Sequence, residues 1–197
     1  MSSISVGPVA AGSIANDASI GSSAWSIVSN ASTEDGNSAS YDAVSGNSQL
    51  LKFSAFGLSI PSGATIDGIQ VRVKKKRASS GANMHDELLK LTYAGSLIGE
   101  NKASATRWPS SLAFTTYGGA TDKWTLTGPS DLTPAMLNDS SFGFVIQGSI
   151  DSNAADDGQV DFGDLQVWYT AAAGGLFTVS SCSGIGCSGP RNFNRLD

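Results

Sequence analysis

Histidine, cysteine and charge are all scarce in this chain. Its 197 residues include one histidine and two cysteines, and charged residues make up only 15%. The chain has no run of about 18 apolar residues, the length that a membrane-spanning helix needs, so we expect no membrane partner. The net charge of −5 also disfavours a protein that binds nucleic acid by neutralising its phosphates. We therefore expect neither nucleic acid nor membrane as a partner.

The few cysteines and the single histidine limit the possible cross-links and metal sites. Cys182 and Cys187 lie close together near the C-terminus, where a disulfide would close a small loop without connecting parts of the core. A structural zinc ion would need two further ligands, and His85 is far away in the sequence. We expect no metal and no cofactor. Residues 1–24 lack a basic start and a continuous apolar block, so we expect no secretory signal.

Glycine and apolar residues, in contrast, are plentiful. Glycine occupies 23 positions and 40% of the residues are hydrophobic, a balance that suits short strands and tight turns better than long helices. The clearest strand is the segment in which Ile69, Val71 and Val73 alternate with polar residues, because a half-buried strand repeats every two residues. We predict that it pairs with Leu88–Tyr93 across a loop at Ser79–Asn83.

Other segments show weaker signs of the same kind. Apolar alternation between turn residues predicts further strands at Trp25–Ile27, Tyr41–Val44, Leu50–Leu58, Leu97–Glu100, Lys123–Thr127, Phe142–Gln147 and Leu165–Thr170. Ala94-Gly95 fits a hairpin turn, and Gly163 fits a bulge. Thr133 followed by Pro134 predicts the start of one short helix. Roughly nine or ten strands indicate an all-β, antiparallel β-sandwich rather than a parallel α/β sheet.

The composition changes near both ends of the chain and predicts three regions. We expect an extended N-terminal arm over residues 1–24, a β-sandwich domain over 25–172 and an extended C-terminal tail, containing Gly, Ser and both cysteines, over 173–197. The tail carries the residues that we regard as potential partner contacts, namely Leu176, Phe177, Arg191, Phe193 and Arg195.

A catalytic site is difficult to assemble from these residues. A Ser/His/Asp triad needs a base, and His85 is the single candidate. Its neighbour Asp86 is badly placed to orient the imidazole, because adjacent residues of a strand point to opposite faces. We therefore expect His85 to be a solvated loop histidine and the protein not to be an enzyme.

Two charged segments suggest binding sites but also have simpler interpretations. The segment Asp151–Gly158 resembles a calcium loop without the glycine and glutamate of an EF-hand. It leaves open either another kind of calcium site at Asp151, Asp156 and Asp157 or a soluble inter-strand loop. Lys74–Arg77 is basic, but its side chains alternate faces on a strand. It indicates a solvated edge or a protein contact rather than a nucleic-acid patch.

Three tryptophans suggest carbohydrate binding, because sugars stack on exposed indole rings. They are Trp108, Trp124 and Trp168. A sandwich of this size also needs large apolar side chains inside, so we expect two of the three in the core or at an interface.

Several stretches between Ile60 and Thr170 follow one another in a characteristic order. Ile60–Val73 reads IPSGATIDGIQVRV, and further motifs lie at Gly99–Ala103, Trp108-Pro109, Tyr117–Trp124, Phe142–Phe144 and Leu165–Thr170. The first resembles an IPxGATIxGIxVxV segment, and the last is similar to an hxVxYT ending. Together they resemble a β-sandwich module that is widespread in bacteriophage virion proteins, over more than half of the chain.

The resemblance implies a jelly-roll-like sandwich in a head decoration, tail or fibre protein, without catalytic residues. We therefore expect a non-enzymatic virion structural protein, specifically a capsid decoration (cement) protein that binds the shell surface and stabilises it after assembly in the host cytoplasm. The expected partners are the major capsid protein or other virion proteins, and analogy suggests a homotrimer. The alternative is a carbohydrate-binding receptor module of a tail appendage or cell-surface protein.

Overall fold

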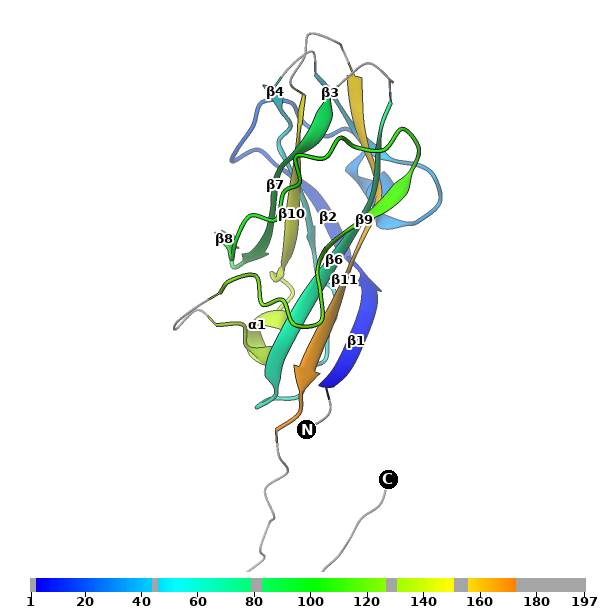
Figure 1. The fold of residues 1–197 in the computed structure, drawn as a ribbon. Helices are drawn as coiled ribbons and strands as arrows, with labels where there is room; N and C mark the ends of the chain where they lie inside the picture. Colours follow the sequence, from blue (N-terminus) through cyan, green and yellow to red (C-terminus); the bar gives the residue numbers. More distant parts are fainter. Residues whose placement is uncertain (1–2, 44–45, 79–82, 127–130, 151–155, 173–197) are drawn as a thin grey trace, which may run out of the picture.

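The computed structural model describes residues 3–43, 46–78, 83–126, 131–150 and 156–172. Within these residues the chain forms two antiparallel sheets that pack face to face (Figure 1). The predicted all-β, antiparallel, jelly-roll-like β-sandwich is therefore confirmed. None of the helices in this part of the chain is long and apolar enough to cross a membrane.

The two sheets are named A and B. Sheet A contains β1 (Ser3–Ala10), β3 (Ala39–Ala43), β6 (Thr65–Arg77), β9 (Ala113–Gly118) and β11 (Asp156–Thr170). Sheet B contains β2 (Ser13–Asp17), β4 (Gly46–Asn47), β5 (Leu50–Ser54), β7 (Met84–Tyr93), β8 (Ser96–Ile98) and β10 (Gly143–Ile150).

The order of the strands places distant parts of the sequence side by side. In sheet A the order is β1-β11-β6-β9, and β3 also pairs with β11. In sheet B the order is β2-β5-β10-β7-β8, and β4 also pairs with β10. Two short helices accompany the sheets, η1 (Val28–Ser32) and α1 (Pro134–Asn138).

The core fills the space between the sheets with the inward-facing residues of each strand. Ile69, Val71 and Val73 of β6 are fully buried, as the period of two predicted. Within sheet B, Phe53 of β5 stacks on its register partner Phe144 of β10 with ring centroids 4.7 Å apart. Burial of such apolar surface is the main favourable contribution to folding.

Two local predictions are confirmed. The Thr133 side chain caps α1 by accepting a hydrogen bond from the Met136 amide, at 3.2 Å. Ala94 and Gly95 join β7 to β8 with φ angles of 48° and 80°, as a tight hairpin turn with two left-handed residues requires.

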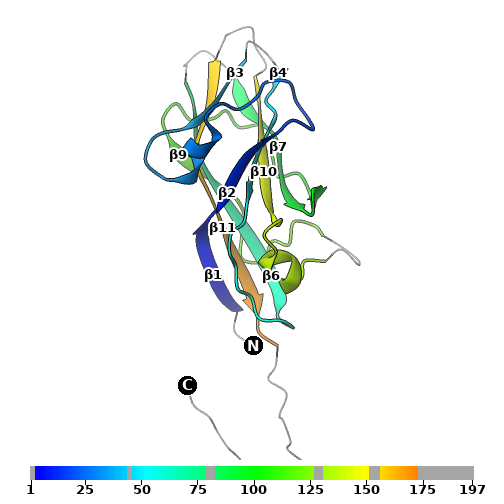
Figure 2. The same cartoon turned by 180° about the vertical axis from the view of Figure 1, so that it is seen from behind.

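The N-terminal segment differs from the expected separate arm. It supplies one strand to each sheet, since β1 pairs with β11 and β2 pairs with β5 (Figure 2). Val6 and Val9 pack partly buried against the core. The apolar residues of the segment are mostly small and scattered, and backbone pairing with β11 and β5 fixes it in both sheets, which composition alone does not reveal.

The predicted pairing of the clearest strand with Leu88–Tyr93 is wrong. The former lies in β6 of sheet A between β11 and β9, whereas the latter lies in β7 of sheet B. The two strands face each other across the core instead of sharing an edge. Alternation identifies which face of a strand is buried but not which strand lies beside it.

Two predicted strands are not strands. Trp25 and Ile27 flank a single bridge between Ser26 and Ser40, and Ile27 is left-handed and 66% exposed. Of the predicted strand Lys123–Thr127, Thr127 lies outside the described residues, and residues 123–126 turn instead of extending, because Trp124 adopts a left-handed conformation with a φ of 57°.

Gly163 does not form the predicted bulge, because the nearby register shift of β11 lies between Val160 and Phe162. Its role is close packing. A Cβ at Gly163 would lie 2.8 Å from ring atoms of both Phe53 and Phe144, so only glycine fits without displacing the rings.

Several predictions concern residues outside the described part of the chain. These are the potential partner contacts Leu176, Phe177, Arg191, Phe193 and Arg195, the cysteines Cys182 and Cys187, and Asp151 of the acidic loop.

Candidate functional site

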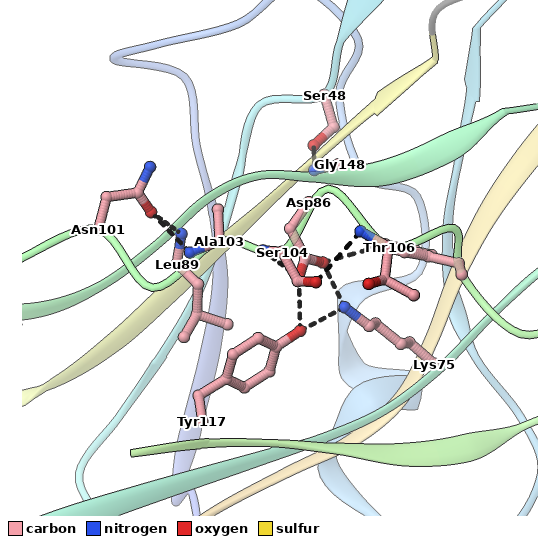
Figure 3. A network of polar contacts seen from close by, with 11 residues as sticks. Ser48, Lys75, Asp86, Leu89, Asn101, Ala103, Ser104, Thr106, Tyr117 and Gly148 are labelled. Atoms are coloured by element: carbon pink, nitrogen blue, oxygen red, sulfur yellow. Dashed lines mark hydrogen bonds and ion pairs between the residues drawn. The ribbon is translucent and has the colours of Figure 1, made fainter. Parts of the chain in front are cut away.

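A polar cluster lies inside the sandwich, between the two sheets (Figure 3). At its centre Asp86 of β7 forms an ion pair with Lys75 of β6. The Asp86 Oδ2 atom accepts hydrogen bonds from the Tyr117 hydroxyl at 2.6 Å and from the Ser104 amide at 3.2 Å. Its Oδ1 atom accepts one from Trp108 Nε1 at 2.8 Å. Lys75 also donates to the Tyr117 hydroxyl.

The strands bring these residues together from different parts of the sequence. Lys75 is the next inward-facing residue of β6 after Val73, so its side chain points into the core. Tyr117 reaches it from β9, the neighbouring strand of the same sheet. Asp86 points inward from β7 of the opposite sheet.

The segment between β8 and β9 closes this cluster and is itself fixed by both sheets. The Trp108 amide donates to the Met84 carbonyl at 2.7 Å, at the start of β7. The Arg77 amide at the end of β6 donates to the Pro109 carbonyl at 2.9 Å. These backbone bonds hold the Trp108 ring over the Lys75 amine, with 4.7 Å from Nζ to the ring centroid.

The cluster is almost completely removed from water. Side-chain exposure is 2% for Lys75 and 1% for Asp86. Burial lowers the pKa of the Lys75 amine, and the neighbouring Asp86 carboxylate opposes this effect. Burial raises the pKa of the Tyr117 phenol, and the Asp86 charge raises it further. The amine is thus easier to deprotonate than an ordinary lysine, while the phenol remains a proton donor.

A small cavity adjoins the cluster. It has a volume of about 40 Å³, and both Lys75 and Asp86 line it together with Ser104, Thr106, Arg107, Trp108, Pro109 and Thr115. One water molecule needs about 10–15 Å³ by this kind of measure, so the cavity is large enough for water but not for an organic substrate.

A second feature lies on the outer face of sheet A, and we call it the outer aromatic patch: Phe114, Phe162, Arg72 and Lys74. Phe114 of β9 is 38% exposed and meets Phe162 of β11 edge to face, with ring centroids 6.4 Å apart. The Arg72 guanidinium lies 4.8 Å from the centroid of the Phe114 ring.

Ion pairs fix the two cations of the outer aromatic patch. Arg72 Nε donates to Asp164 Oδ1 at 2.9 Å, within a two-point contact to that carboxylate. Lys74 Nζ lies 3.0 Å from Asp161 and 2.9 Å from Glu34. Hydrogen bonding to Glu34 and Asp161 raises the pKa of Lys74, so the patch keeps its positive charge at neutral pH.

The basic segment behaves partly as predicted. Its side chains alternate faces, so Lys74–Arg77 does not form one patch. The interpretation as a solvated edge is wrong for Lys75, which is buried beside Asp86. The position of Lys75 two residues after Val73, on the inward-facing register, was the available signal.

The prediction about His85 and Asp86 is confirmed in its geometry. Asp86 is buried and makes its contacts inside the core, whereas His85 is half-buried on the other face of β7. His85 lies within β7 rather than in the loop where the sequence placed it.

The tryptophans also follow the prediction that two of three are internal. Trp108 and Trp124 are 1% and 0% exposed, and Trp124 Nε1 donates to the Ile69 carbonyl at 3.0 Å. Trp168 is half-buried, and its side chain lies on the outer face of β11, opposite to that of the fully buried Val167. Among the described residues no three His, Cys, Asp or Glu side chains gather as metal ligands.

Comparisons with known proteins add little to this geometry. No family model matches the chain, and no curated protein does. A solved structure entitled "CBM4 structure and function", a carbohydrate-binding module, aligns with 68% of this chain and 87% of its own at 12% identity, with a TM-score of 0.37.

Proposed function

We propose that this chain is a non-enzymatic structural protein of a virus particle, a capsid decoration protein that binds the shell surface and stabilises it. The observation that carries the proposal is the outer aromatic patch. It combines an exposed Phe114, a second ring and Arg72 on the outer face of sheet A. Aromatic residues and arginine are the residue types enriched at the centres of protein–protein interfaces.

The rigidity of the patch supports the same proposal. Arg72 and Lys74 are already paired with carboxylates, so binding does not have to immobilise free side chains. Preorganisation of this kind reduces the entropic cost of association. A protein that covers a shell in many copies gains further from multivalency, because each weak contact is reinforced by its neighbours.

The viral context rests on the sequence resemblance between Ile60 and Thr170. In this proposal the protein lies on the capsid surface and binds the major capsid protein or other virion proteins. The proposal includes self-association as a homotrimer. Light scattering of the purified protein over a wide concentration range tests that part, and a strict monomer at the highest concentration contradicts it.

The decisive experiment locates the chain in an intact particle. Heads and tails are separated and analysed by quantitative mass spectrometry, and we expect the chain in the head fraction at many copies. Phe114→Ala combined with Arg72→Ala is then expected to reduce occupancy on capsids at least tenfold, as loss of about 2 kcal/mol would. Thr116→Ala, an exposed change on the same strand, is the control. Absence from purified particles would reject the proposal.

A second candidate is carbohydrate binding, and Trp168 is the observation that favours it. This indole lies half-buried on the outer side of β11. Gln166 of β11 pairs in register with Gln70 of β6 nearby, so two amide side chains share that face. A glycan array tests the idea directly, with Trp168→Ala as the matched variant. Binding that survives the substitution, or an array without any binding, counts against this candidate.

A further inference from the structure

The contact between Lys75 and Asp86 resembles a pair of reactants more than an ordinary ion pair. A buried ion pair recovers its desolvation cost poorly, so its presence in a core is weak evidence that it is there for stability alone. Here the amine and the carboxyl group are held against each other by two sheets, and a phenol, an indole and a backbone amide complete the surroundings of the carboxyl group.

We propose that Lys75 and Asp86 join in an intramolecular amide (isopeptide) bond that links sheet A to sheet B. The bond forms between Nζ of Lys75 and Cγ of Asp86. It is a self-modification of the folded chain and requires no enzyme, cofactor or oxidant. The inference concerns the fold itself and does not depend on the proposed function.

The reaction balances with the two side chains alone. One proton passes from the Lys75 ammonium to the Asp86 carboxylate, giving a neutral amine and a carboxylic acid. The amine lone pair attacks Cγ, and the Nζ–Cγ bond forms. A second proton moves from nitrogen to Oδ1, the Cγ–Oδ1 bond breaks, and one molecule of water leaves. The products are a neutral amide and water.

The neighbouring groups fit the needs of each step. Negative charge develops on Oδ2 in the tetrahedral intermediate, and the Tyr117 hydroxyl and the Ser104 amide both donate to that atom. Two such donors act like an oxyanion hole. Trp108 Nε1 donates to Oδ1, the oxygen that departs. Burial favours the neutral, nucleophilic form of the amine.

The surroundings of the pair also favour formation of the amide over its hydrolysis. The aromatic rings of Trp108 and Tyr117 lie 4.7 and 5.2 Å from Lys75 Nζ and surround much of the amine with apolar surface. The adjoining cavity of about 40 Å³ is lined by both reactants and has room for the water that is released. Well-oriented groups reach effective molarities of about 10⁵–10⁸ M, and amide formation removes two buried charges.

Intact-mass spectrometry of the purified full chain tests the proposal. We expect a mass lower than the sequence mass by one water molecule. A proteolytic digest should then contain a branched peptide in which the segment with Lys75 is joined to the segment with Asp86. An intact mass equal to the sequence mass, unchanged after prolonged incubation of the folded protein, would overturn the proposal.

Lys75→Arg is the matched variant, because arginine keeps the charge beside Asp86 but does not form this amide. We expect its mass to show no loss of water. The control matters because Asp–Gly steps such as Asp67-Gly68 also lose water when they cyclise to succinimides. A water loss that persists in Lys75→Arg and maps to an Asp–Gly step would also overturn the proposal.

Tyr117→Phe tests the role of the phenol. Removal of one oxyanion donor typically slows a reaction about 10²–10³-fold. Freshly prepared Tyr117→Phe protein should therefore contain unlinked chain at times when the wild type is fully linked, and the linked fraction should rise slowly on incubation. Equal rates in the two proteins would overturn the assignment of Tyr117.

Discussion

Lys75 and Asp86 lie on opposite sheets of the sandwich, and their charged ends meet in its interior with 2% and 1% side-chain exposure. Only residues 78–83 separate the end of β6 from the start of β7 in the sequence, yet the two strands belong to different sheets. Their contact therefore connects the two layers at the point where the chain crosses between them. Several measurable properties of the protein follow from this contact and from the packing around it.

Removal of one member of the pair should be far more costly than removal of both. Asp86→Ala leaves the Lys75 amine buried without its partner, and we expect a loss of about 3–5 kcal/mol in the free energy of unfolding. Lys75→Met combined with Asp86→Leu removes both charges and should lose much less. The absence of a cross-link is common to both variants and cancels in the comparison. Denaturant titration measures the difference, and equal losses would contradict the prediction.

The stability of the fold should fall in alkaline solution because of Tyr117. Its pKa is raised by burial, whereas an unfolded tyrosine titrates near pH 10. Above that pH the unfolded chain releases a proton that the folded chain keeps. The free energy of unfolding therefore decreases by up to about 1.4 kcal/mol per pH unit. If Lys75 carries a free amine, its lowered pKa makes the free energy of unfolding rise with pH. That opposing effect ends at about pH 10.4, the ordinary lysine pKa, above which the unfolded chain has also lost this proton.

Thermal or denaturant unfolding between about pH 9 and pH 12 checks this prediction. This range brackets the ordinary tyrosine pKa of about 10. The Tyr117→Phe variant should show a shallower decline than the wild type. Tyr93→Phe is the control, since Tyr93 is half-buried in β7 outside the cluster and should decline like the wild type. Parallel curves for the wild type and Tyr117→Phe would show that this phenol is not responsible.

Gly163 should tolerate no side chain. An alanine Cβ there would lie 2.8 Å from ring atoms of Phe53 and Phe144, and overpacking of this kind costs about 1–3 kcal/mol. At Gly119 a Cβ would meet nothing within 4 Å, so Gly119→Ala should change stability by less than about 0.5 kcal/mol. Melting temperatures of the two variants test the contrast. Similar values for both would mean that the two rings move aside freely.

The C-terminal segment should contribute to particle binding. It contains the apolar residues Leu176, Phe177 and Phe193 and the cations Arg191 and Arg195, which suit contacts with neighbouring subunits. Deletion of residues 176–197 is expected to weaken binding to purified capsids, while the sandwich keeps its thermal stability. Unchanged occupancy on the capsids would remove this segment from the proposed function.

Much of the local structure was predictable, because it depends on neighbours in the sequence. The alternation through Ile69, Val71 and Val73 specified a half-buried strand, and Thr133-Pro134 specified the start of a helix. The conformation of Trp124 was less accessible. The alternation of Trp124 and Leu126 with polar residues suggested a strand, whereas a hydrogen bond from the Trp124 amide to Asp122 Oδ1 at 2.8 Å fixes a turn.

The candidate sites were less predictable, because each joins strands that are distant in the sequence. The sequence pattern singled out neither Phe114 nor Phe162, and only the β9-β6-β11 order brings their rings together around Arg72. Likewise, the sequence around Lys75 indicates a solvated basic run. The burial of Lys75 depends on a carboxylate and a phenol that other strands provide.

The sequence by itself determined the fold class and the face of each principal strand that is buried, since period-two alternation acts along the chain and needs no knowledge of neighbours. The tertiary structure alone decided which strands lie side by side, that the N-terminal segment joins both sheets, and that Lys75 meets Asp86. The reason is physical. Strand order and inter-sheet contacts are set by the packing of the whole core, because many arrangements satisfy the same alternation but few also bring buried polar groups such as Lys75 and Asp86 to their partners.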